Sequence, residues 1–408
     1  MNTLTRRSFL HTVALAASAS ASGEVTSPAA ADAALPKAHP LLTPDKKFYD
    51  VSRGKPKPHA LTGEALIEAR LTAETWRLEL VADPFTSDLV KEPASVARQL
   101  TMADGTAFTL PMLMDLAKQH RVYYLKAMQC LNIAEPLGQG LWEGVPLREV
   151  LRLCGVMRNV RRIYYHGFHN NDPQQIFQSS LSYTEAMETA PGEPPVFLAY
   201  KLNGEPLSLV RGGPVRLVVP WAHGFKSIKW LHRITFTNDF KANDTYANQN
   251  NDPDSPLKTA AYIDKLPDKF EAGKTIHMSG QVISGLSGVE RVEYWLRRVE
   301  PDAPAAALDS GKWLPCALEE EPSDWASILP SGVSPREVVG FDKKTGRAKM
   351  WPLRYGMASW SATLKNVPPG AYEFYARAVD LNGFAQPEPR PIPKAGKNAV
   401  ENHRFEVV

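Results

Sequence analysis

Short apolar runs, broken by Gly, Pro and Asn, recur along this chain. Runs of about four to eight apolar or alternating residues are typical of β-strands. Up to about residue 245, they predict strands at 76–81, 122–128, 162–169, 195–200, 215–219 and 230–236. Apolar residues at helical spacing predict a helix over 109–117, with Thr109 as its N-cap and Pro111 in the first turn, and a second short helix from Leu147.

The pattern changes after a polar stretch at 241–258. Residues 274–282, 289–296 and 371–379 alternate between apolar and polar, which predicts strands with one buried face. In the last of these, Tyr372, Phe374, Ala376 and Ala378 fall on one face. Several short strands separated by Gly and Pro turns predict a β-sandwich.

A chain of 408 residues is too long for one ordinary hydrophobic core, which predicts two domains. We expect one domain over residues 42–245, a linker over 246–261 and a second domain over 262–408. The 34 prolines favour loops and β-structure over long helices. The formal net charge of +3 is too small to indicate nucleic acid as a partner.

Residues 1–31 are expected to be an export signal and a disordered leader. Arg6 and Arg7 stand in the sequence TRRSFL, which is a twin-arginine pattern, and a short apolar run follows at 13–17. That run is far shorter than the ~18 apolar residues that span a bilayer. Export by the twin-arginine route would make the protein periplasmic, with an ordinary secretory signal as the alternative.

Three cysteines cannot all pair within one chain, so at least one stays free in an oxidising compartment. Cys130 follows the strand at 122–128 and opens a loop of Asn, Pro and Gly, after which a turn is expected at 144–146. A thiol there is well placed for chemistry or metal binding, although an inert core cysteine is the alternative. Cys154 and Cys316 are interpreted as packing residues.

A basic segment, RGGPVRLVVPWAHGFKSIKWLHRITF, runs from Arg211 to Phe236. Arg offers a planar fork of donors to an anion, Lys a point charge, and Ser and loop N–H groups supply further donors. Two apolar strands bracket these charges, so we expect them at one end of a core. The alternative is a solvated basic loop between two strands.

The Cys130 loop and this segment together resemble the molybdopterin-dependent oxidoreductases of the sulfite oxidase family. The matching positions of the segment are Gly212, Pro214, Arg216, Pro220, Gly224, Lys226, Ser227 and Lys229. Its P-W-x-x-G-F-K form is most similar to the periplasmic methionine-sulfoxide reductase branch. The resemblance implies an α+β protein: a sulfite-oxidase-type mixed α/β molybdopterin domain with a short helix at 182–189, followed by an immunoglobulin-like β-sandwich that dimerises.

The resemblance also implies a molybdenum-molybdopterin cofactor and the residues that hold it. Cys130 would be the thiolate on the metal and hence the catalytic residue. At the strand end near 169 the family places a polar cofactor contact, for which His166 and His169 are the candidates. The implied cofactor-binding residues are Phe48, Tyr49, His169, Arg211, Arg216, Lys226, Ser227 and Lys229. The family often has His or Asn where Arg211 stands.

The substrate is predicted from charge. Sulfite oxidases continue from the ligand cysteine to a pair of arginines, whereas this chain has no cation between Cys130 and Arg148, and it carries Glu135. A neutral or cationic S- or N-oxide therefore fits the loop better than an anion. A sulfite or sulfane dehydrogenase is the first alternative, and a non-catalytic exported binding protein that kept the fold is the second. Electrons would pass to or from a separate periplasmic carrier, expected to be a c-type cytochrome, and the sandwich implies a homodimer.

Overall fold

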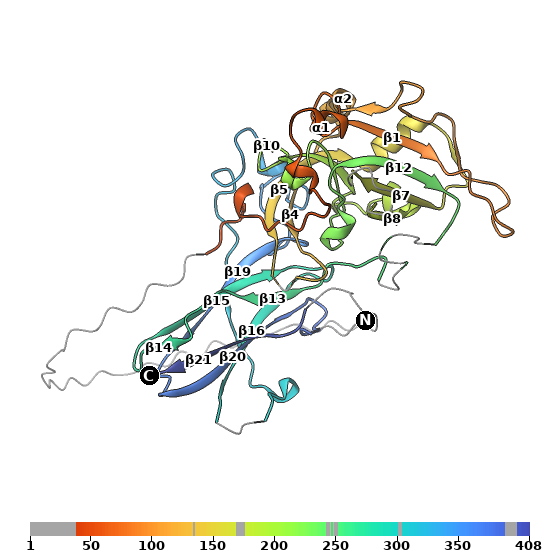
Figure 1. Cartoon of the computed structure of the whole chain (residues 1–408). Helices are drawn as coiled ribbons and strands as arrows, with labels where there is room; N and C mark the ends of the chain where they lie inside the picture. Colours follow the sequence, from red (N-terminus) through yellow and green to blue (C-terminus); the bar gives the residue numbers. More distant parts are fainter. Residues whose placement is uncertain are drawn as a thin grey trace, which may run out of the picture.

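The structure, a computed structural model, describes residues 38–133, 135–168, 176–241, 245, 248, 252–300, 304–387 and 398–408. It is rich in sheets and has few helices, arranged in two regions that lie side by side (Figure 1). In the described ranges, no helix combines the length and the apolar character needed to cross a membrane.

The first region contains two five-stranded sheets that hold the predicted strands. One has the order β3-β1-β12-β7-β8, in which β1 and β12 are parallel. The other has the order β10-β9-β5-β4, with β11 also paired to β9. The bounds of the first sheet are β1 Arg77–Ala82, β3 Phe108–Thr109, β7 Arg162–Gly167, β8 Gln178–Ser182 and β12 Leu231–Thr237. Those of the second are β4 Val122–Met128, β5 Gly138–Pro146, β9 Phe197–Leu202, β10 Glu205–Pro206 and β11 Arg216–Val218.

The described residues of this region include four short α-helices: α1 Gly63–Glu68, which precedes β1, and α2 Leu110–His120, α3 Leu147–Leu151 and α4 Tyr183–Met187, which lie between strands. Thr109 caps α2 by accepting a hydrogen bond from the backbone N–H of Met112, as the sequence predicts. Ser182 and Glu185 form a capping box at the start of α4. A small separate ladder pairs β2 Ser95–Val96 with β6 Met157–Arg158.

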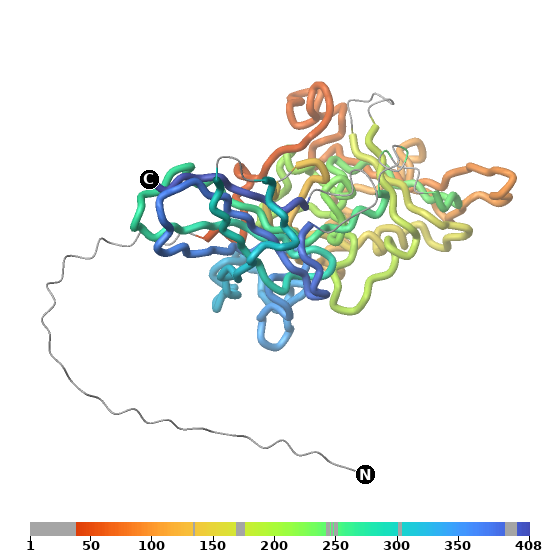
Figure 2. Tube along the Cα trace, turned by 90° about the horizontal axis from the view of Figure 1, so that it is seen from below, coloured from red at the N-terminus to blue at the C-terminus, as the bar shows by residue number. Residues whose placement is uncertain are grey.

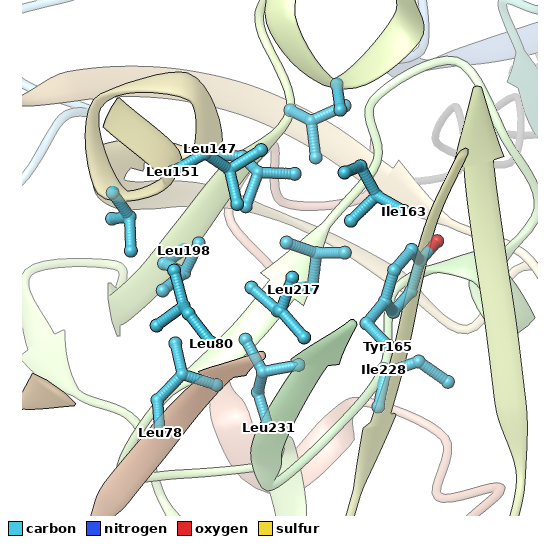
Figure 3. Packing of buried hydrophobic residues seen from close by; sticks show 14 of the residues in the cluster. Leu78, Leu80, Leu147, Leu151, Ile163, Tyr165, Leu198, Leu217, Ile228 and Leu231 are labelled. Carbon is cyan, nitrogen blue, oxygen red and sulfur yellow. The ribbon is translucent and has the colours of Figure 1, made fainter. Parts of the chain in front are cut away.

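Apolar residues from both sheets and from α3 fill one core in this region (Figure 3). Leu78 and Leu80 of β1 meet Leu198 of β9 and Leu217 of β11 there, and Leu147 and Leu151 of α3 cover them. The burial of this many apolar side chains is the main contribution that stabilises the packing of the two sheets. This burial fixes β11 and β12, and these strands and their connecting loop make up most of the basic segment 211–236.

The turn expected at 144–146 is wrong, because β5 continues through these residues to Pro146. The pairing register of β5 with β9 shifts between Glu143 and Gly144. A Cβ atom on Gly144 would lie 2.3 Å from the carbonyl oxygen of Leu198. The glycine therefore marks a close approach of two strands at a bulge and not a chain reversal.

The second region consists of two sheets around a separate core, as the alternating pattern predicts. Residues of β15 and β19 face residues of β16, β20 and β21 across that core. The immunoglobulin-like character of this sandwich stays a prediction. Its strands are β13 Ala260–Ile263, β15 Ile276–Ile283, β18 Ala317–Leu318 and β19 Met357–Leu364 in one sheet, and β14 Lys269–Phe270, β16 Arg291–Arg298, β17 Leu314–Pro315, β20 Gly370–Val379 and β21 Glu401–Val407 in the other.

The two regions share buried surface, and Figure 2 shows them packed against each other. Tyr262, Ile283 and Met357 of the second region belong to the same apolar cluster as Met128 and Trp142 of the first. The irregular segment at 319–356 covers the other face of β4 and β5, where its buried residues pack on Tyr123, Leu125 and Leu141. Those buried residues are Trp325, Leu329, Val338, Phe341 and Leu353.

Candidate functional site

One cleft collects most of the predicted site residues. It encloses about 950 Å³ of empty space, open solvent included. Its walls come from the N-terminal segment 48–53, the ends of β4 and β5, and the loop between β11 and β12. The predicted residues that line it are Phe48, Tyr49, Cys130, Arg211, Arg216, Ser227 and Lys229.

Cys130 is a free, half-buried thiol that comes two residues after the end of β4. Its loop is braced by Gln129, whose side-chain amide donates to the carbonyl of Ile133 at 2.7 Å. Cys154 is buried in the first core, and burial raises the pKa of its thiol to about 11. Cys316 packs beside the sandwich core, where burial also raises its pKa. The packing roles of both are confirmed, which leaves Cys130 as the thiol that faces the cleft.

A metal at Cys130 would need ligands from outside the protein. Within the ranges that the structure covers, no group of three or more His, Cys, Asp or Glu side chains could hold a metal ion. One thiolate is a single ligand, and metals in proteins usually take four or more. The remaining ligands would have to come from a bound cofactor.

Arg216 is a buried cation that lacks a carboxylate partner among the contacts described. Its guanidinium donates to the carbonyl oxygens of Arg211 and Ser227, lies over the Trp142 ring, and leaves Nε buried with no hydrogen-bond partner. Burial and the nearby Arg211 charge lower the pKa of Arg216 to about 9. A buried charge without a partner is costly, so this position favours an anionic ligand.

Lys229 and Ser227 stand beside Arg216 on the same cleft wall. The Lys229 ammonium donates to Asp50 Oδ1 at 3.1 Å, Ser52 Oγ at 2.6 Å and the Val210 carbonyl at 2.6 Å. Burial and Arg216 lower the pKa of Lys229 to about 7. The Ser227 hydroxyl accepts a hydrogen bond from the Val219 N–H at 3.0 Å, so its proton is available to another group.

Arg211 holds the N-terminal segment against the cleft. Its guanidinium donates to the carbonyls of Phe48 at 3.2 Å and Tyr49 at 3.4 Å, and it lies 3.3 Å from a carboxylate oxygen of Asp45. The Phe48 ring packs edge-on against Trp142, with ring centroids 6.4 Å apart. Arg211 therefore positions the two aromatic residues, in addition to any contact it makes in the cleft.

Three of the residues considered in the sequence analysis, Lys226, His166 and Glu135, lie within the described ranges but do not line the cleft. Lys226 is buried and donates to the Ser180 carbonyl at 2.6 Å. His166 lies on β7, and His169 lies outside the described residues. The Glu135 side chain is exposed. Its charge acts on Glu401 in the second region, whose pKa is raised to about 7 mainly by burial and further by Glu135. The predicted repulsion between Glu135 and an anionic substrate therefore has no geometric support.

Arg53 was missed by the sequence analysis. Its guanidinium lies 4.5 Å from the centroid of the Phe177 ring, and both residues line the cleft together with Cys130. No local pattern marks Arg53, because it joins the site only through the path of the N-terminal segment.

The charge of the cleft is consistent with a bound anion. Among the described residues that line it, four are Arg or Lys (Arg53, Arg211, Arg216 and Lys229) and none is Asp or Glu. Apolar and aromatic side chains form much of the remaining wall, which strengthens electrostatic interactions by keeping water out. A large cofactor with a phosphate group and a planar ring system fits these cations and aromatic side chains.

Comparisons with known proteins agree with this geometry. Residues 68–245 match the family described as the oxidoreductase molybdopterin binding domain. The protein-methionine-sulfoxide reductase catalytic subunit MsrP of Xanthomonas axonopodis pv. citri is 33% identical over 136 residues, which are 31% of this chain and 38% of that protein. A nitrate reductase [NAD(P)H] of Betula pendula is 28% identical over 200 residues, 47% of this chain and 21% of that protein. The chain thus spans well under half the length of these relatives.

A solved structure with the same overall fold extends the likeness to both regions. The crystal structure of the sulfane dehydrogenase SoxCD from Paracoccus pantotrophus aligns with a TM-score of 0.56 at 18% sequence identity. The alignment covers 86% of each chain. At this identity the likeness concerns the fold alone.

Proposed function

We propose that this chain is a molybdenum-molybdopterin enzyme of the sulfite oxidase family, exported from the cytoplasm, that transfers an oxygen atom to or from a small S- or N-oxide. The match of residues 68–245 to the oxidoreductase molybdopterin binding domain supports this proposal. The observation that carries the proposal is the cleft itself. It combines the free thiol of Cys130 with the uncompensated cation of Arg216. A binding protein without a cofactor has no use for that combination.

Four residues of the cleft would hold the cofactor. Cys130 would supply the protein thiolate to molybdenum, and Arg216, Lys229 and Ser227 would bind the pterin phosphate. When bound, the cofactor supplies a redox-active metal that accepts or donates the oxygen atom and two electrons. The aromatic residues Phe48 and Trp142 narrow the cleft and restrict water.

A second substrate class is favoured by one observation. Arg53 lines the same cleft as Cys130, and Glu135 does not. A cation in this position could pair with a sulfite or sulfane-derived anion, which makes a sulfite or sulfane dehydrogenase the second candidate. The two candidates differ in the charge of the substrate and in the direction of electron flow.

The setting of the enzyme follows from the rest of the chain. The leader at 1–31 supports export to the periplasm by the twin-arginine route. The sequence contains no C-x-x-C-H haem-attachment motif, so we propose electron exchange with a separate carrier, a c-type cytochrome. We further propose that the sandwich pairs two chains about a two-fold axis. Light scattering on the mature chain at micromolar concentration tests this, and a monomer would refute it.

The test of the function has two steps. Mature protein, exported by its own pathway from a molybdenum-replete host, should contain one molybdenum and one pterin per chain. Absence of both would refute the proposal and leave the non-catalytic binding protein. Steady-state assays then compare sulfoxide reduction with a reduced dye against sulfite oxidation with a cytochrome c acceptor. Turnover of sulfite alone would select the second candidate.

A further inference from the structure

Lys126 is a fully buried cation that the proposed function does not use. It lies on β4, four residues before Cys130, and its relative exposure is 0%. Its ammonium donates to the carbonyl oxygens of Pro220 at 2.7 Å and Ala222 at 3.3 Å. These carbonyls belong to the loop between β11 and β12, ahead of Ser227 and Lys229.

The charge on Lys126 has no carboxylate partner among its described contacts. Both hydrogen bonds go to backbone carbonyls, and the neighbouring charge that acts on it is Arg216, which is of the same sign. Burial and Arg216 lower the pKa of Lys126 to about 7. Two adjacent buried cations without an anion are unfavourable in the empty protein, and a doubly charged anion in the cleft would compensate both.

β4 holds this loop at a third point. The N–H of Gly224 donates to the carbonyl of Gln129 at 2.6 Å, and a Cβ on Gly224 would come within 3.1 Å of that oxygen. Lys126 of β4 and Gln129, which follows the strand, therefore both hold the 220–224 loop close to the segment that carries Cys130. These contacts connect the loop that leads to Ser227 and Lys229 with the segment that leads to Cys130.

We infer that Lys126 is a positioning residue for the pterin phosphate: it fixes the 220–224 loop relative to Cys130 and adds a second buried positive charge behind Arg216. This rests on the proposed cofactor. Lys126 is not among the residues that line the cleft, so it acts through the loop and through its charge. Removing that charge should weaken cofactor retention without harming the empty fold.

The test uses the full chain with Lys126→Gln and Lys126→Met, purified from a molybdenum-replete host. Gln keeps a donor for the loop carbonyls and loses the charge, whereas Met loses both. Lys118→Met on α2 is the matched control, because the Lys118 side chain is 75% exposed. Pterin per chain and the thermal midpoint of the emptied protein are measured for each variant.

We expect both Lys126 variants to retain roughly tenfold less pterin than wild type, the order expected for one lost charge-assisted interaction. The emptied Lys126→Gln protein should unfold no earlier than the emptied wild type, and Lys118→Met should match wild type in both measurements. Wild-type pterin content in Lys126→Gln would overturn the inference. So would a lowered thermal midpoint in the emptied Lys126→Gln chain, which would make Lys126 a purely structural residue. Wild-type protein without pterin would instead overturn the proposed function, on which the inference depends.

Discussion

Arg216 and Cys130 are the residues on which the proposed chemistry depends, and the protein supports them in different ways. Cys130 is half-buried on a braced loop, where it can be replaced at little structural cost. Arg216 is buried, and its donors are only partly satisfied. Substitutions at these positions should therefore have separable effects on cofactor content, turnover and stability.

Cys130→Ser should abolish turnover and leave the fold intact, because it removes the thiolate and keeps a similar shape. Activity and far-UV circular dichroism are the measurements. Cys316→Ser is the control, since that half-buried thiol packs beside the sandwich core, and its turnover should stay at the wild-type level. Full activity in Cys130→Ser would show that Cys130 is not the metal ligand.

Arg216→Ala should lower the pterin content per chain, because the phosphate loses a buried fork of donors, an interaction of about 1.5–3 kcal/mol. Arg233→Ala on β12 is the matched control, since Arg233 is exposed and pairs with Glu79. Its pterin content should not change. Equal pterin content in both variants would indicate that the basic segment is a solvated loop that does not bind the phosphate.

The stability of the emptied protein should rise with pH above neutrality. Lys126 has a pKa near 7 in the folded chain, owing to burial and Arg216, against 10.5 in the unfolded chain. Between these values the unfolded chain binds more protons, so the free energy of unfolding increases with pH. Urea unfolding at several pH values in this window checks the slope, which Lys126→Met should reduce. An unchanged slope in that variant would show that Lys126 titrates normally.

At the scale of elements, β4 and β5 organise the site. Cys130 follows the end of β4, and Lys126 of the same strand contacts the 220–224 loop. Trp142 lies on β5, and its ring lies beneath the Arg216 guanidinium. The strand β9, which pairs with β5, comes so close to it at Gly144 that no side chain fits between the two strands. The bulge in β5 follows shortly after Trp142, the residue of this strand that lines the cleft.

Gly144→Ala should destabilise the protein by about 2–3 kcal/mol or more, because its Cβ would overlap the Leu198 carbonyl and force the two strands apart. Denaturant unfolding measures the change. Gly273→Ala provides the comparison, as it has a positive φ but open space around it, and should cost only about 1–2 kcal/mol. Equal losses would mean that strand contact at Gly144 is not the limiting feature.

At the scale of the whole molecule, the two regions are not independent. The segment at 319–356 covers one face of β4 and β5, and the cluster around Met128 and Trp142 includes residues of β13, β15 and β19. Residues 39–41 also connect the two regions. The ring of His39 contacts Asp264 of the second region at 2.8 Å, and Leu41 packs in the same cluster as Leu125 of the first. The second region is thus part of the support of the cleft.

Removing everything after residue 261 should give an insoluble or aggregating protein, because Tyr123, Leu125 and Leu141 would lose their cover. The soluble fraction and light scattering of the truncated chain are compared with those of the mature chain. A soluble, folded monomer that still binds pterin would show that the second region serves assembly alone.

The sequence by itself determined the features that depend on neighbours along the chain. Continuous apolar runs located β4 and β12, and alternating runs located the sandwich strands β15, β16 and β20. The Thr109 cap located α2, because a capping residue acts on its neighbours along the chain. The spacing of Arg216, Ser227 and Lys229 around two apolar strands was sufficient to predict that these donors gather at one end of a core. The position of Cys130 after a strand was sufficient to predict a thiol in the loop that follows β4.

Only the tertiary structure decided which of these groups face the cleft. Arg53 lines the cleft and Glu135 does not. Lys226 donates to the Ser180 carbonyl, and Lys229 donates to Asp50. These outcomes depend on contacts between residues far apart in the chain, and sequence spacing carries no information about them. The same holds for Gly144, because a bulge and a turn use the same residue and differ only in what lies opposite.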